Sequence, residues 1–317
     1  MTQCISGIHH VTAITADGQK SLDFYTGLLG LRLVKITVNF DDPRSYHLYY
    51  GDELGRPGTI MTFFVWPGAQ RGRSGSSQAA ATSFSIPRSS MDFWQNRLTA
   101  SGVSVENSPT RFGEQVLSFN DPDGIRLELV AASSQDSRPA LKASSVSIEH
   151  TIRGFHGVTL SEKGCEPTAD ILTKSFGFVS AGQEGNRFRF IGSASSAQTV
   201  DLLCIPAASR GKLGAGIVHH VAFRAADSDA QRQWRQVLVD HKQNVTPIID
   251  RTYFQSIYFR EPGGVLFEIA TDGPGFTVDE PSETLGTTLK LPPQHEKARS
   301  IIETVLPPLR LPGASGS

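Results

Sequence analysis

The sequence predicts an α+β fold built from four βαβββ modules, which form two domains with curved mixed sheets. Three observations lead to this prediction. Two segments of the chain repeat one another, each copy holds a turn between two strand-like runs, and the two halves of the chain begin with similar segments, GIHHVTAI and GFHGVTLS. Repeats at a fixed spacing indicate that one supersecondary unit is used several times.

The clearest repeat relates residues 111–130, RFGEQVLSFNDPDGIRLELV, to residues 251–270, RTYFQSIYFREPGGVLFEIA. Each copy places a turn, DPDG or EPGG, between two strand-like runs, which is typical of a β-hairpin. The residues that match in register are Arg111 and Arg251, Gln115 and Gln255, Phe119 and Phe259, Pro122 and Pro262, Gly124 and Gly264, and Glu128 and Glu268. Modules two and four are therefore predicted to end in similar hairpins.

Four helices are predicted, one in each module. Two of them precede the hairpins, and their apolar residues recur at helical spacing. The other two are shorter and end in a glycine, which suits a left-handed helix C-cap. The segments are 90–101 with Phe93, Trp94 and Leu98, 228–241 with Trp234, Val237 and Leu238, and 22–30 and 169–177, which end in Gly30 and Gly177.

The remaining strands of modules one and three are predicted near LRLVKITV, YHLYYG and GTIMTFFV, and near FRFIG and TVDLLCI. The modules then run from about residue 5 to 66, 78 to 132, 150 to 206 and 214 to 272. They group into a first domain over residues 1–132, a polar linker over 133–149 and a second domain over 150–272. A Pro-rich tail follows over 273–317, with one short helix predicted near 295–306.

The composition is that of a globular protein, because 38% of the 317 residues are hydrophobic and 19% are charged. The formal net charge of −1 argues against a broad nucleic-acid or anionic-membrane surface. The sequence shows no secretory signal pattern and no apolar run long enough to span a membrane. Three scattered cysteines, Cys4, Cys165 and Cys204, predict no disulfide framework and no zinc–thiolate site. We therefore expect a cytoplasmic protein.

Four βαβββ units in two pairs resemble the vicinal-oxygen-chelate superfamily, which includes glyoxalase I, the fosfomycin and bleomycin resistance proteins and the extradiol ring-cleaving dioxygenases. The segments GIHHVTAI, YHLYYGDELGRPGT, GIVHHVAFR and GGVLFEIATDGPGF resemble, more specifically, its hydroquinone and chlorohydroquinone dioxygenases. The resemblance covers nearly the whole chain before the tail. It implies a metal site built from the first and last strands of paired modules.

Comparison of these strands singles out modules one and four. Their first strands carry paired histidines, whereas module three has Gly157 in the column of His10, and module two has no histidine. The last strand of module four supplies Glu268. Two histidines and one carboxylate form the facial triad that is typical of non-haem Fe(II) sites. The predicted ligands are His10, His220 and Glu268, with Fe(II) as the metal and Mn(II) as a plausible substitute.

The choice between the two histidines of each pair comes from the resemblance, because strand alternation alone leaves it open. A strand histidine is more often structural, but two pairs at matching positions favour ligands. The resemblance also implies pocket roles for the three residues His9, His219 and Thr12. Either of the first two could act as an acid or base, since imidazole titrates near neutrality.

Gly157 also predicts a swapped arrangement in which module one faces module four. Catechol-type dioxygenases usually pair modules three and four, which would nominate His156 as a ligand. In the swapped arrangement Glu128 has no histidine partner in its own module. We interpret it as a structural carboxylate.

Two further residues are predicted near the metal. If the hairpin around Gly263 is symmetric, Tyr258 lies directly across from Glu268, with Cβ atoms about 5 Å apart. Its phenol could then donate to a bound substrate oxygen. Arg251 resembles a family residue that holds an anionic ring oxygen. Because Arg111 repeats it in the other hairpin, a structural salt bridge is the alternative.

The ligand pattern and the resemblance together imply an extradiol-type, Fe(II)-dependent ring-cleaving dioxygenase that acts with O2 on a small aromatic substrate, and the resemblance points to a hydroquinone. A glyoxalase-like isomerase or lyase is one alternative, but it usually needs a fourth ligand, and the last strand of module one shows no carboxylate. A metal-free protein that binds a drug or a quinone is the other, and the paired histidines argue against it. The oligomeric state, including a homo-oligomer, stays open.

Overall fold

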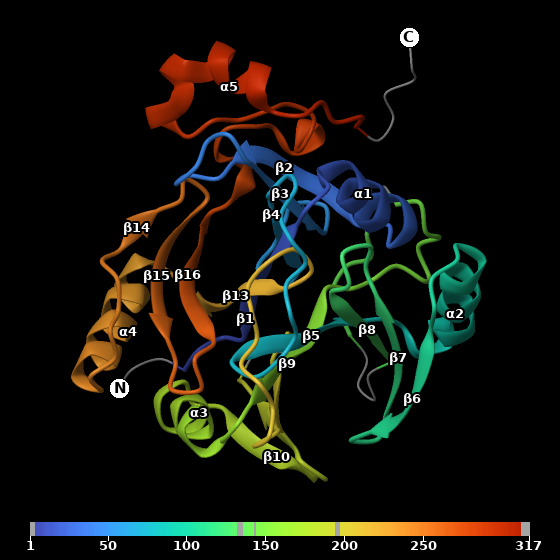
Figure 1. The fold of residues 1–317 in the computed structure, drawn as a ribbon, viewed down its shortest axis with the longest axis vertical. Coiled ribbons are helices and arrows are strands. Elements are labelled where there is room, and N and C mark those ends of the chain that lie inside the picture. Colours follow the sequence, from blue (N-terminus) through green and yellow to red (C-terminus); the bar gives the residue numbers. More distant parts are fainter. Residues whose placement is uncertain (1–3, 132–135, 143, 194–196, 312–317) are drawn as a thin grey trace.

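The chain folds into two eight-stranded mixed sheets that pack side by side (Figure 1). The structure is a computed structural model, and it describes residues 4–131, 136–142, 144–193 and 197–311, with the backbone alone for 107–109. Parts of the predicted linker and tail, residues 133–135, 143 and 312–317, lie outside the described residues, as does residue 132. The predicted α+β class and the four βαβββ modules are confirmed.

Each module follows the predicted order of strand, helix and three strands. Module one contains β1 (Ile8–Thr15), α1 (Gly18–Leu22) with a π-helical extension (Asp23–Leu28), β2 (Arg32–Val38), β3 (Tyr46–Gly51) and β4 (Ile60–Val65). Module two contains β5 (Gln78–Ser85), a short 3-10 turn (Arg88–Ser90), α2 (Met91–Ala100), β6 (Glu106–Arg111), β7 (Glu114–Asn120) and β8 (Arg126–Ala131).

Modules three and four repeat this order. Module three contains β9 (Phe155–Glu162), α3 (Glu166–Asp170) with a π-helical extension (Ile171–Ser175), β10 (Val179–Glu184), β11 (Arg187–Ile191) and β12 (Thr199–Cys204). Module four contains β13 (Val218–Ala225), α4 (Ser228–Asp240), β14 (Ile249–Asp250), β15 (Phe254–Arg260) and β16 (Leu266–Pro274). The tail adds three 3-10 segments (Phe276–Val278, Ser282–Thr284 and Pro293–Ala298) and α5 (Arg299–Val305).

The strand order shows that the modules pair across the two halves of the chain. One sheet has the order β14-β15-β16-β13-β1-β4-β3-β2 and combines modules four and one; we call it the 1/4 sheet. The other has the order β10-β11-β12-β9-β5-β8-β7-β6 and combines modules three and two; we call it the 2/3 sheet. In each sheet two first strands, β1 and β13 or β9 and β5, run antiparallel at the centre. This is the swapped arrangement that Gly157 predicted.

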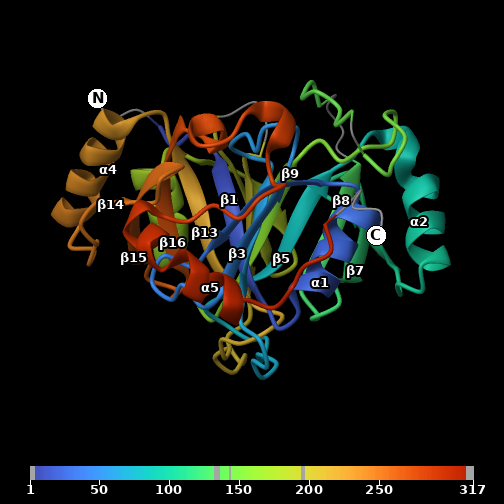
Figure 2. The same cartoon turned by 90° about the horizontal axis from the view of Figure 1, so that it is seen from above.

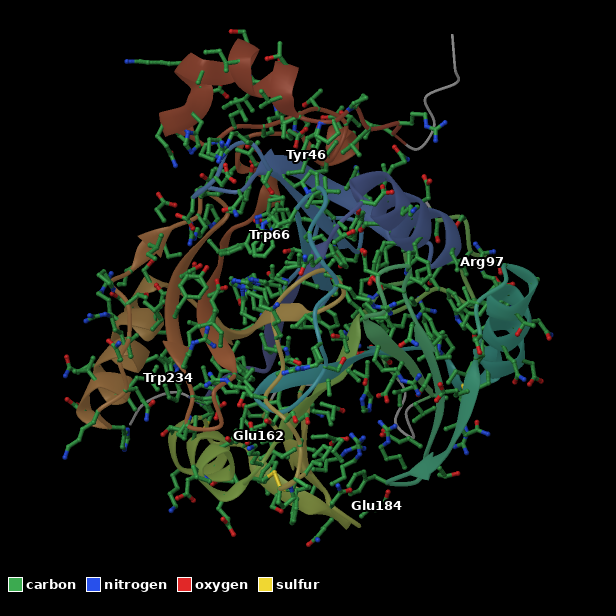
Figure 3. All side chains as sticks on the ribbon, in the orientation of Figure 1. Tyr46, Trp66, Arg97, Glu162, Glu184 and Trp234 are labelled. Carbon is green, nitrogen blue, oxygen red and sulfur yellow. A yellow bond between two sulfur atoms is a disulfide. The ribbon has the colours of Figure 1, made fainter. Side chains whose placement is uncertain are left out.

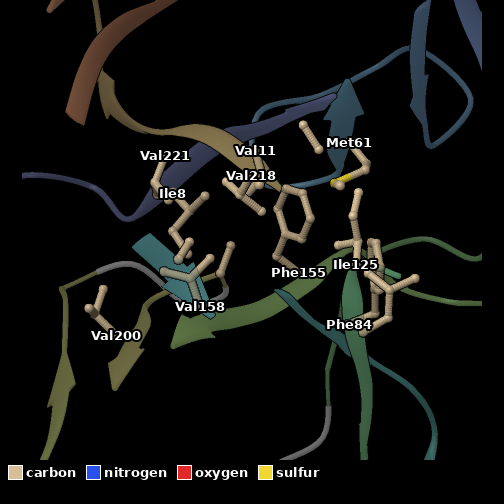
Figure 4. Close-up of a cluster of buried hydrophobic side chains, with 14 of the residues drawn as sticks. Ile8, Val11, Met61, Phe84, Ile125, Phe155, Val158, Val200, Val218 and Val221 are labelled. Atoms are coloured by element: carbon tan, nitrogen blue, oxygen red, sulfur yellow. The ribbon is translucent and has the colours of Figure 1, made fainter. Parts of the chain in front are cut away.

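The hydrophobic core joins the two sheets (Figure 4). Val11 on β1 and Val221 on β13 are fully buried, as are Phe84 on β5 and Phe155 on β9. Because strand side chains alternate between faces, the neighbours of Val11 and Val221 point into the concave interior of the 1/4 sheet. The central strands therefore have an apolar face for the core and a second face that is free to carry polar groups.

The helices cover the outer faces of the sheets, with α2 and α4 on opposite sides of the molecule (Figure 2). Trp94 and Leu98 of α2, and Trp234 and Leu238 of α4, are buried, as the helical spacing predicted. The shorter helices end where Gly30 has φ 70° and Gly177 has φ 77°. These are left-handed conformations that glycine adopts without steric cost, and they confirm the predicted C-caps.

One expectation about the cysteines is wrong, because Cys165 and Cys204 form a disulfide. Their Cα atoms lie 5.8 Å apart although 39 positions separate them in the sequence. The cause is the parallel pairing of β9 and β12, which puts Cys204 level with Glu162, just ahead of Cys165. The scattered cysteines therefore no longer support the expectation of a cytoplasmic protein. Among the described residues, no helix is both long and apolar enough to cross a membrane.

Candidate metal centre

The two central strands of the 1/4 sheet bring the paired histidines together. In the antiparallel register His10 pairs with Ala222, and Thr12 pairs with His220, so the strands are related by an approximate twofold axis. On the other side of β13, Glu268 of β16 pairs with Ala222. His10, His220 and Glu268 therefore lie on one face of three neighbouring strands, and all three are buried.

The three side chains converge on one point. Glu268 Oε2 lies 2.9 Å from His220 Nε2 and 3.3 Å from His10 Nε2. The two Nε2 atoms lie 3.3 Å apart. These three residues form the group of potential metal ligands that the described part of the chain contains.

A β-bulge in each strand explains how the first histidine of each pair supports the second. The register of β1 shifts between Ile8 and His10, and that of β13 shifts across His219. A bulge re-aims a side chain that regular alternation would send to the opposite face. As a result, His9 Nδ1 lies 2.9 Å from His10 Nδ1, and His219 Nδ1 lies 2.8 Å from His220 Nδ1.

These contacts determine which ring nitrogen of His10 is free. His9 Nε2 lies 3.1 Å from the carbonyl oxygen of Thr271, which can only accept, so this nitrogen carries the hydrogen. Burial holds the pKa of His9 well below its ordinary value, and His10 lowers it further, so the ring is neutral. His9 Nδ1 then accepts from His10 Nδ1, and His10 Nε2 points its lone pair at the centre. His220 takes the same form when its Nδ1 donates to His219.

The charge state of the centre also suits a cation. Burial opposes ionisation of Glu268, but His10 and His220 hold the pKa of its carboxyl well below the ordinary value whenever they turn an N–H toward it. When both rings carry their hydrogen on Nδ1, a bound cation takes over this role. Burial lowers the pKa of His220 in spite of the opposing effect of Glu268. Ser256 Oγ donates to Glu268 Oε1 at 2.5 Å, whereas Oε2 has no hydrogen-bond partner among the described residues. Three converging lone pairs repel one another unless a cation lies between them, so the residues fit a divalent metal ion.

The predicted neighbours Tyr258 and Arg251 lie at this centre. Tyr258 pairs with Glu268 across the β15–β16 hairpin, which confirms the predicted register. Its ring centroid lies 5.7 Å from that of His220, and burial, followed by Glu268, raises the pKa of its hydroxyl. The Arg251 guanidinium lies 5.6 Å from the Tyr258 ring centroid and 3.6 Å from Asp41. Both side chains line the same pocket as His10 and His220.

The 2/3 sheet shows what these positions become without histidines. Gly157 stands in the place of His10, and Ala81 in that of His220. Glu128 accepts two hydrogen bonds of 2.9 Å from Arg111, and Ser83 donates a third. The structural interpretation of Glu128 fits this ion pair. Arg251 makes no such bond to Glu268, but its guanidinium lies 3.6 Å from the carboxylate of Asp41, so Arg251 forms an ion pair with a different partner.

The twofold relation also identifies residues that the sequence analysis missed. In the 1/4 sheet, Thr12 pairs with Thr62 and Thr62 with Tyr49, as Ala222 pairs with Glu268 and Glu268 with Tyr258. Thr62 is therefore the fourth corner of the centre, and it is not a carboxylate. The missed pocket residues are His47, Tyr49, Phe64, Phe254, Asn39, Phe40 and Asp41. Extending the repeat register to module one could have found Tyr49, whereas the loop over 39–41 leaves no repeat signal.

Comparison with known proteins places this geometry in a family. The Glyoxalase/Bleomycin resistance protein/Dioxygenase superfamily matches residues 7–129 and 154–269. A Bacillus subtilis protein named "Putative ring-cleaving dioxygenase MhqO" is 45% identical over 98% of this chain and 99% of its own length. The chlorohydroquinone/hydroquinone 1,2-dioxygenase of Sphingobium indicum is 35% identical over 96% of this chain and 97% of its own.

Solved structures are similar as well. A crystal structure from Bacillus subtilis, described as a putative dioxygenase, has a TM-score of 0.94 and 45% identity, covering 98% of this chain and 99% of its own. Glyoxalase I from Zea mays has a TM-score of 0.62 at 13% identity, over 84% of this chain and 92% of its own, which is a likeness of fold alone.

Proposed function

The chain belongs to the glyoxalase/bleomycin resistance protein/dioxygenase superfamily, and from this premise we propose that it is an Fe(II)-dependent ring-cleaving dioxygenase that acts on a hydroquinone. The observation that carries the proposal is the convergence of His10, His220 and Glu268 with no carboxylate at the fourth corner. Two imidazoles and one carboxylate leave coordination positions open, as non-haem Fe(II) oxygenases require. The names of the two curated relatives support the reaction class.

The glyoxalase-like alternative is less well supported by the same geometry. Such isomerases usually hold their metal with a fourth protein ligand, often a second carboxylate. In this chain Thr62 occupies that corner, and its hydroxyl is bonded to Thr12 at 3.0 Å and to His47 at 2.7 Å. A threonine whose hydroxyl already makes two hydrogen bonds is a poor metal ligand. The coordination positions left open at this corner therefore favour a reaction in which the metal binds both a substrate and O2.

In the proposed reaction, Fe(II) would bring the substrate oxygen and O2 together and let electron density pass between them. The protein residues would do the rest. Tyr258 and Arg251 line the pocket beside the ligands and would stabilise negative charge that develops on the substrate oxygen. His9 and His219 fix the orientation of the ligand rings through their contacts with His10 and His220. Phe254 and Phe64 wall the pocket and limit the access of water.

The first prediction tests the ligand set. The variants His10→Ala, His220→Ala and Glu268→Gln each remove one converging lone pair. Purified protein loaded anaerobically should hold close to one Fe(II) or Mn(II) per chain, and each variant should retain less than about a tenth of it, because losing one of three ligands removes much of the binding free energy. Elemental analysis measures the metal directly, without reference to turnover.

The matched controls come from the other sheet. His156 lies 3.0 Å from Glu114, and Glu128 is bonded to Arg111, so neither reaches the metal centre. His156→Ala and Glu128→Gln should keep wild-type metal content. Loss of metal in His156→Ala together with full metal in His10→Ala would show that the module pairing is wrong. O2 uptake by the loaded wild type with a panel of hydroquinones and catechols then tests the reaction itself.

A further inference from the structure

A second pocket lies beside the metal centre in the 1/4 sheet. His220 lines both this pocket and the metal pocket. In the β15–β16 hairpin, Tyr258 pairs with Glu268 and, two residues nearer the turn, Arg260 pairs with Leu266, so all four side chains share one face. Arg260 therefore follows Tyr258 on this face, roughly 7 Å further along the strand, and lines the second pocket. We call this space the Arg260 pocket.

The Arg260 pocket is cationic. Arg260 donates to the carbonyl oxygen of Gly264 at 3.0 Å, and Arg210 Nη2 lies 3.8 Å from the position that a Cβ on Gly264 would take. Both arginines line the pocket, and no carboxylate of the described residues lines it with them. Neither guanidinium forms an ion pair within the described part of the chain. Two like charges near one glycine repel each other, so an anion bound in this pocket would be stabilised.

The twofold-related pocket of the 2/3 sheet has the same construction, but its charge is neutralised. The β7–β8 hairpin lines it with the residues that match Arg260 and Leu266 in the repeat. Asn120 stands in the place of Arg260, and Arg126 in that of Leu266. Arg126 donates to both carboxylate oxygens of Glu106, at 3.0 and 2.5 Å. The arginine of this pocket is therefore already paired.

Module four has no counterpart of this carboxylate. Glu106 lies across from Ser118 in the pairing of β6 with β7. The matching neighbour of Tyr258 is Thr246, whose backbone N–H and hydroxyl both bond to the Tyr258 backbone. A threonine carries no charge, so it cannot neutralise an arginine of the Arg260 pocket. Of the two related pockets, the one beside the metal centre is therefore the one with unpaired cations.

We propose that the Arg260 pocket is a carboxylate-binding subsite of the metal centre. The inference rests on the proposed function, because ring cleavage forms a carboxylate where a neutral diol had none. O2 supplies one oxygen atom to each carbon of the broken C–C bond. The hydroxylated carbon becomes a carboxylic acid and its neighbour a carbonyl, with no further oxidant, and the acid releases its proton to solvent at neutral pH. Guanidinium groups bind the resulting anion through charge-assisted hydrogen bonds.

The carboxylate has two sources, the ring-opened product and a carboxyl group carried by the substrate ring. In the first case the two arginines attract the product after a neutral substrate has reacted. In the second case they select anionic substrates before the reaction. Binding measurements without turnover separate the two sources.

Anaerobic titration of the Fe(II)-loaded protein with trans,trans-muconate, a six-carbon dicarboxylate, tests the subsite. The wild type should bind muconate, and Arg260→Gln and Arg210→Gln should each weaken the binding by about tenfold, the effect of one hydrogen bond to a charged group. Arg260→Lys should bind more tightly than Arg260→Gln, because it keeps the charge. Both arginines are exposed, so the variants should keep their fold and metal content.

Arg126→Gln is the matched control. It removes the arginine of the twofold-related pocket, which Glu106 already neutralises, so it should keep the wild-type affinity for muconate. An equal loss of affinity in this control would assign the binding to general surface charge and overturn the inference.

Hydroquinone and 2,5-dihydroxybenzoate, compared in the same anaerobic titration, identify the source of the carboxylate. If the wild type binds the acid about tenfold more tightly and Arg260→Gln cancels the difference, the substrate carries it. If the wild type binds the two within about twofold while muconate binding depends on Arg260, the product carries it.

Failure of the subsite differs from failure of the proposed function. A wild type that binds no muconate overturns the inference, as do Arg260→Gln and Arg210→Gln proteins with normal metal content and unchanged muconate affinity. A loaded wild type that consumes no O2 with any aromatic diol overturns the proposed function, whatever the titrations show.

Discussion

At the scale of single residues, Glu128 and Glu268 show how neighbours decide the use of one repeated carboxylate. Both follow the same turn, and both accept a hydrogen bond from a serine, Ser83 or Ser256. Both carboxylate oxygens of Glu128 accept hydrogen bonds from Arg111, whereas Oε2 of Glu268 contacts the two histidines. Arg251, which matches Arg111 in the repeat, therefore does not pair with Glu268 and can take another role in the β15–β16 hairpin.

Tyr258 carries the second prediction. Tyr258→Phe keeps the ring and removes only the hydroxyl that faces the metal centre. Removing one preorganised donor can reduce turnover on the order of 100-fold, or about 3 kcal/mol. We expect normal metal content and fold but a much lower kcat for hydroquinone, because the hydrogen bond strengthens as charge develops. Steady-state O2 uptake on the iron-loaded variant measures this.

The matched control is Tyr46→Phe, which removes a hydroxyl from a half-buried tyrosine on β3 that does not line the pocket. It should keep wild-type kcat. A Tyr258→Phe enzyme with wild-type kcat would make Tyr258 a packing residue.

At the scale of elements, two carboxyl groups hold the β15–β16 hairpin against α3. Thr168 Oγ1 lies 2.6 Å from Glu162 Oε2 and 2.6 Å from Glu261 Oε2, and Glu162 is fully buried. Figure 3 shows Glu162 beside α3, near the tip of the hairpin. Burial, and then the charge of Glu261, raise the pKa of Glu162 to about 8. Near neutral pH, Glu162 is therefore protonated in the folded protein and ionised in the unfolded chain.

The third prediction follows from this difference. Between the ordinary carboxyl pKa of 4.5 and about 8, the folded state binds more protons than the unfolded state, so stability falls as pH rises. Glu162→Gln should remove this slope and be more stable than the wild type above pH 8, by on the order of 3 kcal/mol. Urea unfolding at several pH values measures it.

Glu166→Gln is the control for that series, because Glu166 is exposed in the same segment. Its unfolding free energy should follow the wild type at every pH. An identical slope in Glu162→Gln and the wild type would show that the pair does not share a proton in the folded protein.

At the scale of the whole molecule, the tail closes one end of the 1/4 sheet. Figure 1 shows it crossing above β2 and β3. Lys35 of β2 is fully buried and contacts two tail carboxylates, Asp279 at 2.5 Å and Glu280. Phe276 packs 5.1 Å from the Tyr49 ring centroid, so the tail also supports the pocket wall. The predicted helix near 295–306 is present as α5 and packs Ile302 against Val38.

The fourth prediction concerns this closure. Glu280→Ala leaves the buried ammonium of Lys35 with a single carboxylate, so it should destabilise the protein by about 2–4 kcal/mol. Glu283→Ala, on the exposed surface of the same tail, should change stability by less than about 0.5 kcal/mol. Chemical denaturation measures both. Equal stability of the two variants would mean that the tail adds little to the fold.

The sequence by itself determined the features that depend on local periodicity and on repeated segments. The module count, the helix C-caps at Gly30 and Gly177 and the register of Tyr258 with Glu268 all follow from patterns within short stretches. The register of a hairpin is set by its own turn. Alignment of the repeats shows that module three has Gly157 where module one has the ligand His10. The ligand set was predictable for the same reason, once the resemblance had selected one histidine of each pair.

Only the tertiary structure decided the features that join distant segments. The bulges that turn His9 and His219 toward the ligands exist because β1 pairs with β13, about two hundred residues away. Strand alternation could not reveal them. The Cys165–Cys204 disulfide likewise needs the crossing of β12 to β9. The hydrogen bonds of His47 and Thr62 join side chains from three strands. They form across strands or between alternate residues of one strand, so the local sequence does not indicate which side chains are in contact.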